Sequence, residues 1–534
     1  MIQTKHTVFF NAKIFTANSD ALYADTFSVK DGIIEWIGHH SDVPFSLEGE
    51  MDLEGRTVIP GIIDAHLHPV YLADFVKQIP CMPPVTNSIE ELKERIRERR
   101  SEQQAGDWIE SWGYDEGKLT EGRAPNRHDL DEACSDSPVV VTRTCAHIIA
   151  VNSKALEIAG LDRNTPDPKG GQFERDENGE LTGIIREIPA QKAVKDCMPK
   201  LTQTETAKLL VETGNDLVIH GITAVTEMMA LHDGAYDYLE MYREARSLGF
   251  THDTVMYYTL DEFKKLDAAT SIDHGAPIRI GGIKLFSDGS VSGRTAWISE
   301  PFKGGQEEHG ISTTTCEELT EAADLAERYG IQLAVHAMGD NAINLIIETF
   351  ADREPWLEGK PSIRIEHAAM PSERALEIAQ QAGIAFVPQS IFLFAEIESY
   401  LTNLGEGRTE SSYPIKTFLE RGIQTALSSD APATSWVDPV NPFIGIQSAV
   451  TRIAYNGVDT GQSERIDVET AVVLYTREAA AVCGLERQGM LKAGYKANFA
   501  VLDRDLFTIP GDDIGDVSVY ATYMDGEAVY QMKI

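Results

Sequence analysis

Three features are scarce in this chain of 534 residues: basic charge, paired cysteines and long apolar runs. Its 47 basic residues face 84 acidic ones, and the net charge of -37 argues against nucleic acid or an anionic membrane as a partner, because both require patches of Lys and Arg. Six cysteines without any Cys-x-x-Cys spacing argue against a disulfide framework or a structural zinc. No apolar run approaches the roughly 20 residues that span a bilayer, and no signal-peptide pattern opens the chain, so we expect a cytoplasmic protein.

The chain does have a β-like apolar run over 57–63 that leads into Asp64-Ala65-His66-Leu67-His68. Two histidines one residue apart on an extended backbone point to the same side, and imidazole is the commonest protein ligand of a catalytic metal. Later apolar runs contain or end in further polar residues, which are Lys284, His336, His367 and Asp430. This series predicts a metal site built from the ends of several strands. Taken singly, each histidine also fits an ordinary core or surface position, and Asp430 also fits a helix N-cap.

A local pattern recurs from the middle of the chain onward: an amphipathic helix, a glycine, then Ile or Phe opening a β-rich run. Over 316–329, for example, Thr315 and Glu318 predict a capping box at the start of a helix. Strands that alternate with such helices imply an α/β fold with a parallel sheet, either doubly wound or closed. Eight units without a glycine-rich dinucleotide turn favour a (β/α)8 TIM-like barrel, with the active site at the carboxyl ends of its strands. The expected strands are 58–66, 222–228, 252–259, 278–286, 331–336, 362–367, 384–389 and 423–429.

Two regions fall outside this repeat. Residues 1–57 and 490–534 contain short strands and Asp-Gly hairpin turns, and neither has enough apolar surface to fold alone. We expect them to form one small composite β domain, sandwich-like in character. Residues from about 70 to 205 interrupt the barrel after its first strand and are too long for a bare loop, so we expect a substrate-enclosing subdomain there. The barrel with this insertion would span 58–489.

The order of the motifs resembles the amidohydrolase superfamily, in the branch of N-substituted-formamide-deformylase-like proteins (amidohydrolase family three). The segments that carry the resemblance are 60–68, 146–153, 182–187, 284–290, 336–340, 428–432, 475–480 and 489–503. The resemblance implies a metal-dependent hydrolase of a carbon–nitrogen bond, amide or N-formyl-like, in a small molecule. The attacking group in such an enzyme is a metal-bound hydroxide.

The resemblance also implies a ligand set. His66 and His68 would bind one divalent metal ion, most simply zinc, and His336 and His367 a second ion about 3.5–4 Å away. Asp430 would contact the first ion and act as the catalytic acid and base, because an amide nitrogen must be protonated to leave.

Lys284 stands where many members of the superfamily carry a carboxylated lysine that bridges the two ions. A buried amine with a lowered pKa can stay neutral and add carbon dioxide. Alternatively, Lys284 is an unmodified lysine near Asp288, and Glu187 supplies the carboxylate or contacts substrate.

His147, Glu187, Asp288 and Trp297 are the expected substrate-binding residues, although His147 also fits a buried structural histidine. Two other functions stay open. A deaminase of the same superfamily usually has one metal and a His-Glu pair near the fifth strand, whereas Ala337 follows His336 here. A non-catalytic regulatory or binding protein on this fold is disfavoured by the complete ligand set. The substrate and the oligomeric state, homo-oligomer included, do not follow from the sequence.

Overall fold

The computed structural model describes residues 6–43, 49–75, 77–144, 148–232, 236–305 and 307–533. The chain divides into two compact units. The first comprises residues 1–70, 210–431 and 440–534, and the second comprises 71–209 and 432–439. Among the residues described, no helix is long and apolar enough to cross a membrane.

A parallel sheet forms the centre of the first unit. In the described part of the chain it has seven strands in the order β20-β19-β18-β17-β16-β15-β8. These are β8 (Ile62–Asp64), β15 (Ile222–Ala230), β16 (Asp253–Thr259), β17 (Ile278–Phe286), β18 (Gln332–Ala337), β19 (Ile363–His367) and β20 (Ala385–Val387). Residues from both ends of the sheet, such as Ile63 on β8 and Val387 on β20, belong to one buried cluster. The sheet is therefore curled around a common core.

The strand expected over 423–429 is wrong as a strand. In the described residues this segment makes only an isolated parallel bridge to β20, between Thr425 and Phe386. Farther along, the Asp430 N–H donates to the His66 carbonyl, 2.8 Å away and just past the end of β8. Within the segment, the Leu427 N–H donates to the Leu474 carbonyl, which belongs to a helix (Val468–Leu474) and not to a strand, so no continuous ladder forms.

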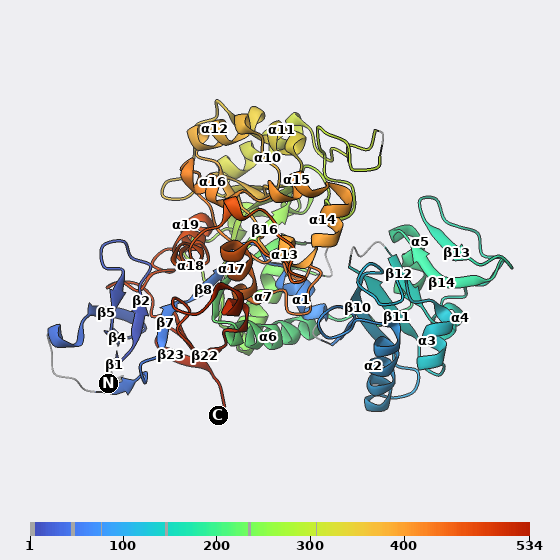
Figure 1. The fold of residues 1–534 in the computed structure, drawn as a ribbon, viewed down its shortest axis with the longest axis horizontal. Coiled ribbons are helices and arrows are strands. Elements are labelled where there is room, and N and C mark those ends of the chain that lie inside the picture. Colours follow the sequence, from blue (N-terminus) through green and yellow to red (C-terminus); the bar gives the residue numbers. More distant parts are fainter. Residues whose placement is uncertain are drawn as a thin grey trace. The chain divides into compact units, whose positions relative to one another are not determined.

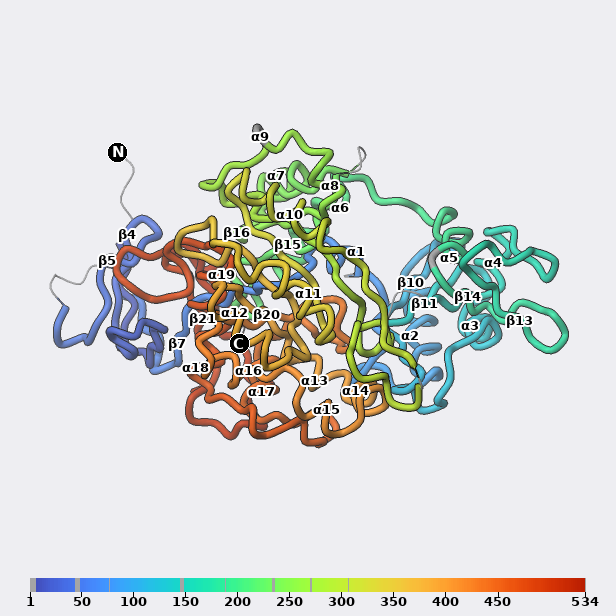
Figure 2. Tube along the Cα trace, turned by 90° about the horizontal axis from the view of Figure 1, so that it is seen from above, coloured from blue at the N-terminus to red at the C-terminus, as the bar shows by residue number. Residues whose placement is uncertain are grey.

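Helices of the first unit cover the outside of this sheet, and α7, α8, α10 and α11 pack directly on β16, β17 or β18. Figures 1 and 2 show α11 beside both α10 and α12. Helices α1 and α6 cross the boundary between the two units, and α7 to α19 belong to the first unit. Their bounds are α1 (Pro69–Phe75), α6 (Gln203–Ile219), α7 (Tyr238–Leu248), α8 (Leu260–Phe263), α9 (Ala268–Ser271), α10 (Cys316–Tyr329), α11 (Asp340–Phe350), α12 (Glu373–Ala382), α13 (Ile391–Ala395), α14 (Ile397–Asn403), α15 (Glu406–Glu410), α16 (Ile415–Glu420), α17 (Pro442–Thr451), α18 (Val468–Leu474) and α19 (Arg477–Cys483).

Helix α10 shows how the sequence sets these boundaries. The Thr315 hydroxyl accepts the Glu318 N–H, and the Glu318 carboxylate accepts the Thr315 N–H, which completes the expected capping box. Gly330 ends the helix in the left-handed conformation, with φ at 65°. Leu319 and Ala326 are buried, so the apolar face lies against β17 and β18.

Strands from the two chain ends pair with each other (Figure 1). Their six-stranded sheet has the order β23-β22-β21-β7-β2-β3, and a four-stranded sheet of order β5-β4-β1-β6 accompanies it. The strands are β1 (His6–Phe10), β2 (Lys13–Phe15), β3 (Tyr23–Ala24), β4 (Thr26–Lys30), β5 (Ile33–Gly38), β6 (Glu50–Asp52), β7 (Thr57–Pro60), β21 (Phe499–Leu502), β22 (Val519–Met524) and β23 (Glu527–Gln531). Phe9 and Phe27 stack at 5.0 Å and meet Phe499 from the other chain end, so the two ends share one core.

The second unit contains its own six-stranded sheet in the order β13-β14-β12-β11-β10-β9, with helices α2 to α5 (Figure 2). Its elements are β9 (Ile79–Pro80), α2 (Ile89–Glu102), β10 (Ile109–Tyr114), α3 (Arg127–Ala133), β11 (Val139–Arg143), β12 (Ile148–Val151), α4 (Ser153–Ile158), β13 (Gln172–Arg175), β14 (Leu181–Arg186) and α5 (Ile188–Lys195). Two buried clusters, one around Leu92 and one around Leu156, give this unit cores of its own.

Candidate metal centre

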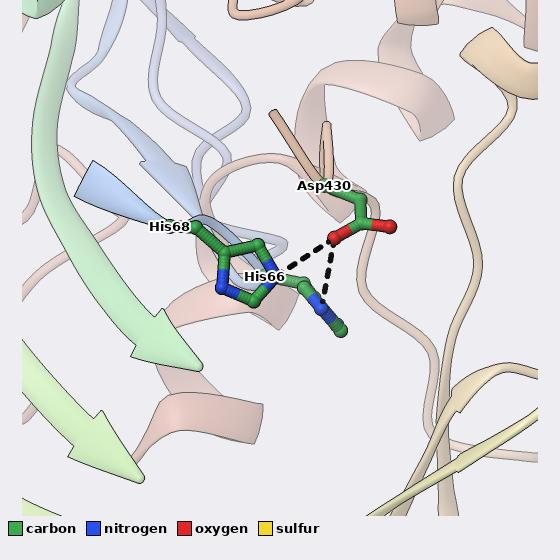
Figure 3. A group of neighbouring side chains, drawn as sticks. All are labelled: His66, His68 and Asp430. Atoms are coloured by element: carbon green, nitrogen blue, oxygen red, sulfur yellow. Dashed lines mark hydrogen bonds and ion pairs between the residues drawn. The ribbon is translucent and has the colours of Figure 1, made fainter. Parts of the chain in front are cut away.

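His66 and His68 lie just beyond the carboxyl end of β8 and face Asp430 (Figure 3). The Nε2 atoms of the two rings each lie 3.1 Å from the same carboxylate oxygen, Oδ1 of Asp430. One ligand atom from each of the three residues can be chosen so that all lie within 4.8 Å of one another. His66 is 1% exposed and Asp430 6% exposed, whereas His68 is partly exposed, so the cluster is largely buried but open to solvent on the His68 side.

Asp430 lies in the left-handed region, with φ at 55°, which aspartate tolerates better than most residue types with a side chain. The hydrogen bond from its N–H to the His66 carbonyl holds the turn in place. Burial alone would raise the pKa of the carboxyl group, but the charges and hydrogen bonds of His66 and His68 outweigh it and hold that pKa well below its usual range. The carboxylate is therefore ionised and available as a ligand or base.

His68 also faces a second buried carboxylate. Its Nδ1 atom lies 3.8 Å from Oε1 of Glu227, which comes from β15 and is fully buried. Burial would lower the pKa of His68, but the carboxylates of Asp430 and Glu227 outweigh it and raise the pKa to about 9. A metal ion would replace the proton on this imidazole, because only neutral imidazole can act as a ligand.

His336 and His367 lie side by side at the carboxyl ends of β18 and β19. Their ring centroids lie 4.3 Å apart, and the His367 ring is 5.1 Å from that of His66. The His336 Nε2 atom lies 3.0 Å from the Gly289 carbonyl, so a proton donated there leaves Nδ1 with a lone pair.

His367 is buried in the left-handed region, with φ at 71°. Its Nδ1 atom has no hydrogen-bond partner in the described part of the chain and lies 4.0 Å from Oδ2 of Asp430. Burial and the neighbouring His336 hold the pKa of His367 well below its usual range. A neutral imidazole with an unused nitrogen is what a metal ion requires.

Lys284 lies on β17 and is 1% exposed. Its Nζ atom has no hydrogen-bond partner among the residues described. Burial lowers the pKa of the amine to about 8, although the carboxylates of Glu366 and Asp430 work in the opposite direction. An amine of this kind is partly neutral near physiological pH and is therefore nucleophilic.

Asp288 has backbone partners. It is 3% exposed, and its carboxylate accepts the N–H groups of Trp297 at 2.9 Å, Met338 at 3.0 Å and Gly339 at 2.8 Å. These bonds tie the loop after β17 to the loop after β18. The geometry places Asp288 in the framework behind His336, and it holds half-buried Trp297 through the main chain.

The other two expected substrate-binding residues belong to the second unit. Glu187 follows β14, is exposed, and has φ at 66°, a value uncommon for a residue with a side chain. His147 lies outside the described residues.

The sequence reasoning did not assign a role to Glu366 and Glu227, which are fully buried carboxylates near the two histidines that follow β8. The signal was present at Glu366, because Arg364 and Glu366 alternate with isoleucines in one short strand. A charged side chain on a strand buried on both faces demands a partner.

The residues present fit a divalent cation. Imidazole nitrogens and carboxylate oxygens are the ligands that zinc and its neighbours take in hydrolases. The three ligand atoms of His66, His68 and Asp430 are close enough to bind one ion. The unpartnered, buried Nδ1 atom of His367 fits coordination of a further ion, and the unpartnered Lys284 amine beside it would contribute a ligand only once carboxylated.

Comparisons with known proteins point to metal-dependent hydrolases of one family. A family model described as the amidohydrolase family matches residues 49–530. YtcJ of Bacillus subtilis is 29% identical over 97% of this chain and 98% of its own length. The N-substituted formamide deformylase of Arthrobacter pascens is 26% identical over 99% of both chains. A metal-dependent hydrolase of Pyrococcus horikoshii has a solved structure with a TM-score of 0.76 at 25% identity, covering 95% of this chain and 99% of its own.

The fold and the site define a metal-binding hydrolase with a TIM-barrel-like architecture. The chain belongs to the amidohydrolase family.

Proposed function

We propose that this protein hydrolyses a carbon–nitrogen bond, of the amide or N-formyl kind, in a small molecule. The observation that carries the proposal is the convergence of four histidines and Asp430 beside a buried lysine at the carboxyl ends of the strands. The bond type is supported by the likeness to the N-substituted formamide deformylase over nearly the whole of both chains.

Two metal ions are part of the proposal. His66, His68 and Asp430 would hold one, and His336 with His367 the other. When bound, such ions lower the pKa of a water molecule toward neutrality and polarise the substrate carbonyl.

Asp430 carries the proton transfers in this account. Its carboxylate is ionised, buried and adjacent to two imidazoles, so it can accept a proton from water. Returning that proton to the leaving nitrogen completes the hydrolysis, because an amide anion is a poor leaving group.

Residues 424–430, although not a regular strand, would also close the barrel by filling the position between β20 and β8. This proposal is supported by the bridge between Phe386 and Thr425 and by the hydrogen bond from Asp430 to His66. Such a closure would explain why Asp430 reaches the histidines of the first strand.

The test is a panel of N-formyl, N-acyl and cyclic amides, together with ring amines, incubated with zinc-loaded protein. We expect release of a carboxylate and an amine from at least one amide, and loss of that activity in Asp430→Asn. Ammonia released from a ring amine, with every amide intact, would identify a deaminase instead. No turnover of any compound by fully metallated protein would favour a binding protein.

A further inference from the structure

A buried ion pair lies directly behind His66. Arg364 and Glu366, both on β19, are each 0% exposed, although they alternate with the apolar Ile363 and Ile365. Glu366 Oε2 lies 2.6 Å from the Nδ1 atom of His66, on the side of the ring away from Asp430. One imidazole therefore connects two carboxylates, and each of its nitrogens faces one of them.

The Arg364 guanidinium forms a bidentate salt bridge with the Glu366 carboxylate. Its Nε atom donates to Oε1 at 2.5 Å, and its Nη2 atom donates to Oε2 at 2.9 Å. The same guanidinium donates to the Ala65 carbonyl at 2.6 Å and to the Tyr257 hydroxyl at 3.2 Å. Because Ala65 precedes His66 in the chain, Arg364 fixes both the carboxylate and the backbone from which the histidine extends.

The hydrogen-bond network continues from Arg364 away from the metal centre, and its polar groups find partners on that side as well. The Tyr257 hydroxyl donates to Oε1 of Gln332 at 2.6 Å, and the Gln332 amide donates to the carbonyls of Pro361 and Val482. These partners come from β16, β18, the segment before β19 and the end of α19, so the network ties four parts of the fold together. Burying an ion pair in this way seldom adds stability over an apolar pair of similar size. Its place behind a single histidine indicates a role at that histidine.

We propose that Glu366 is a positioning residue for the metal centre. It accepts the Nδ1 proton of His66, which leaves the lone pair of Nε2 directed at the position where the metal ion binds beside Asp430. Arg364 keeps the Glu366 carboxylate in this orientation. The inference rests on the proposed metal site and adds a residue that determines how tightly that site holds its ion.

The test compares zinc affinity in Glu366→Gln and in a matched control, using competition with a chelating indicator at a temperature well below unfolding. Glutamine has the same shape, but its amide must turn a donor toward either His66 or Arg364, which are both donors. The control is Asp253→Asn, at the amino end of β16. Asp253 is also a buried carboxylate, 6% exposed, and it accepts from Lys496 and from Gln488, the latter at 2.8 Å.

We expect Glu366→Gln to weaken zinc binding about 10–100-fold and to change the visible spectrum of the cobalt-substituted protein. Asp253→Asn should lose stability without either change. If Glu366→Gln does not fold, the pair Arg364→Met with Glu366→Gln replaces both charges and must show the same loss. A loss smaller than fivefold relative to Asp253→Asn, in whichever variant folds, overturns the inference. Wild-type protein that binds no zinc would contradict the proposed function instead, so the two failures are distinguishable.

Discussion

Lys284 combines two properties that rarely occur together in a lysine. Its side chain is buried, and its Nζ atom has no hydrogen-bond partner among the residues described. At 4 Å and an effective dielectric near 20, a permanent ammonium would be repelled by one divalent ion by roughly 8 kcal/mol. A charged Lys284 is therefore incompatible with a two-metal centre at this distance, whereas a carboxylated one would bridge the ions.

We predict that Lys284→Ala loses activity, and that bicarbonate together with a short carboxylic acid partly restores it, because the acid can fill the vacated space and bridge the ions. The measurement is turnover and zinc content with and without these additives. Lys93→Ala is the control, because Lys93 is also buried but pairs with Glu90 and Glu132 on α2 and α3.

Glu187→Gln should keep both metal ions. If instead Lys284→Ala retained two ions and Glu187→Gln lost one, the bridge would belong to Glu187. That result would contradict the carboxylated lysine.

At the scale of secondary structure, β23 is an edge strand made by the last residues of the chain. It pairs antiparallel with β22, which pairs with β21 and through it with β7 near the other chain end. Its own side chains are largely exposed, so its contribution is mainly to occupy the backbone hydrogen bonds of β22.

We predict that removal of residues 528–534 exposes the β22 edge and yields aggregating protein. Size-exclusion chromatography and light scattering would measure this. A truncation that removes only residues 533–534, beyond the end of β23, should remain monodisperse. If the longer deletion were equally well behaved, the pairing of β23 with β22 would be dispensable.

Much of the element order could be predicted from local pattern. The apolar runs over 222–228 and 278–286 are strands β15 and β17, and the capping signals set the bounds of α10. The segment 423–429 could not be predicted correctly as a non-strand, because an apolar run does not reveal that it makes only an isolated bridge to β20 and that its Leu427 N–H donates to Leu474 at the end of α18.

The site shows the same limit. Histidines after strand ends were visible in the sequence, but the partners of Asp288 and Glu366 depend on which strands become neighbours. Asp288 accepts hydrogen bonds from the backbone of a loop about fifty positions later in the chain. Glu366 contacts a histidine that follows β8, the strand at the other end of the sheet order. Contacts of this kind depend on the tertiary fold and leave no local pattern in the sequence.

At the scale of the whole molecule, the net charge of -37 creates self-repulsion that weakens as carboxylates protonate in mild acid. One buried group has the opposite effect on stability, because its protonation in acid destabilises the folded protein. Burial lowers the pKa of His252 from 6.5 to about 4, and its Nε2 atom donates to the Ile222 carbonyl at 3.1 Å. Because the unfolded chain binds this proton more readily, the stability that the neutral histidine provides is complete above pH 6.5 and is lost as the pH falls toward 4.

We predict that His252→Gln makes stability less sensitive to acid. Between about pH 7 and about pH 5, the wild type should lose about 2 kcal/mol of unfolding free energy more than the variant does. Urea unfolding at both pH values measures the difference, and the effect of net charge cancels because both proteins carry it. Equal losses in the two proteins would contradict a neutral, buried His252.

The central claim is that His66, His68 and Asp430 hold a catalytic metal ion, and zinc content per chain tests it most directly. Wild-type protein reconstituted with zinc and freed of excess metal should retain roughly two ions per chain. His66→Ala should lose metal and all activity while remaining folded, and His128→Ala, at an exposed histidine on α3, should match the wild type. A fully metallated and active His66→Ala protein would contradict the account.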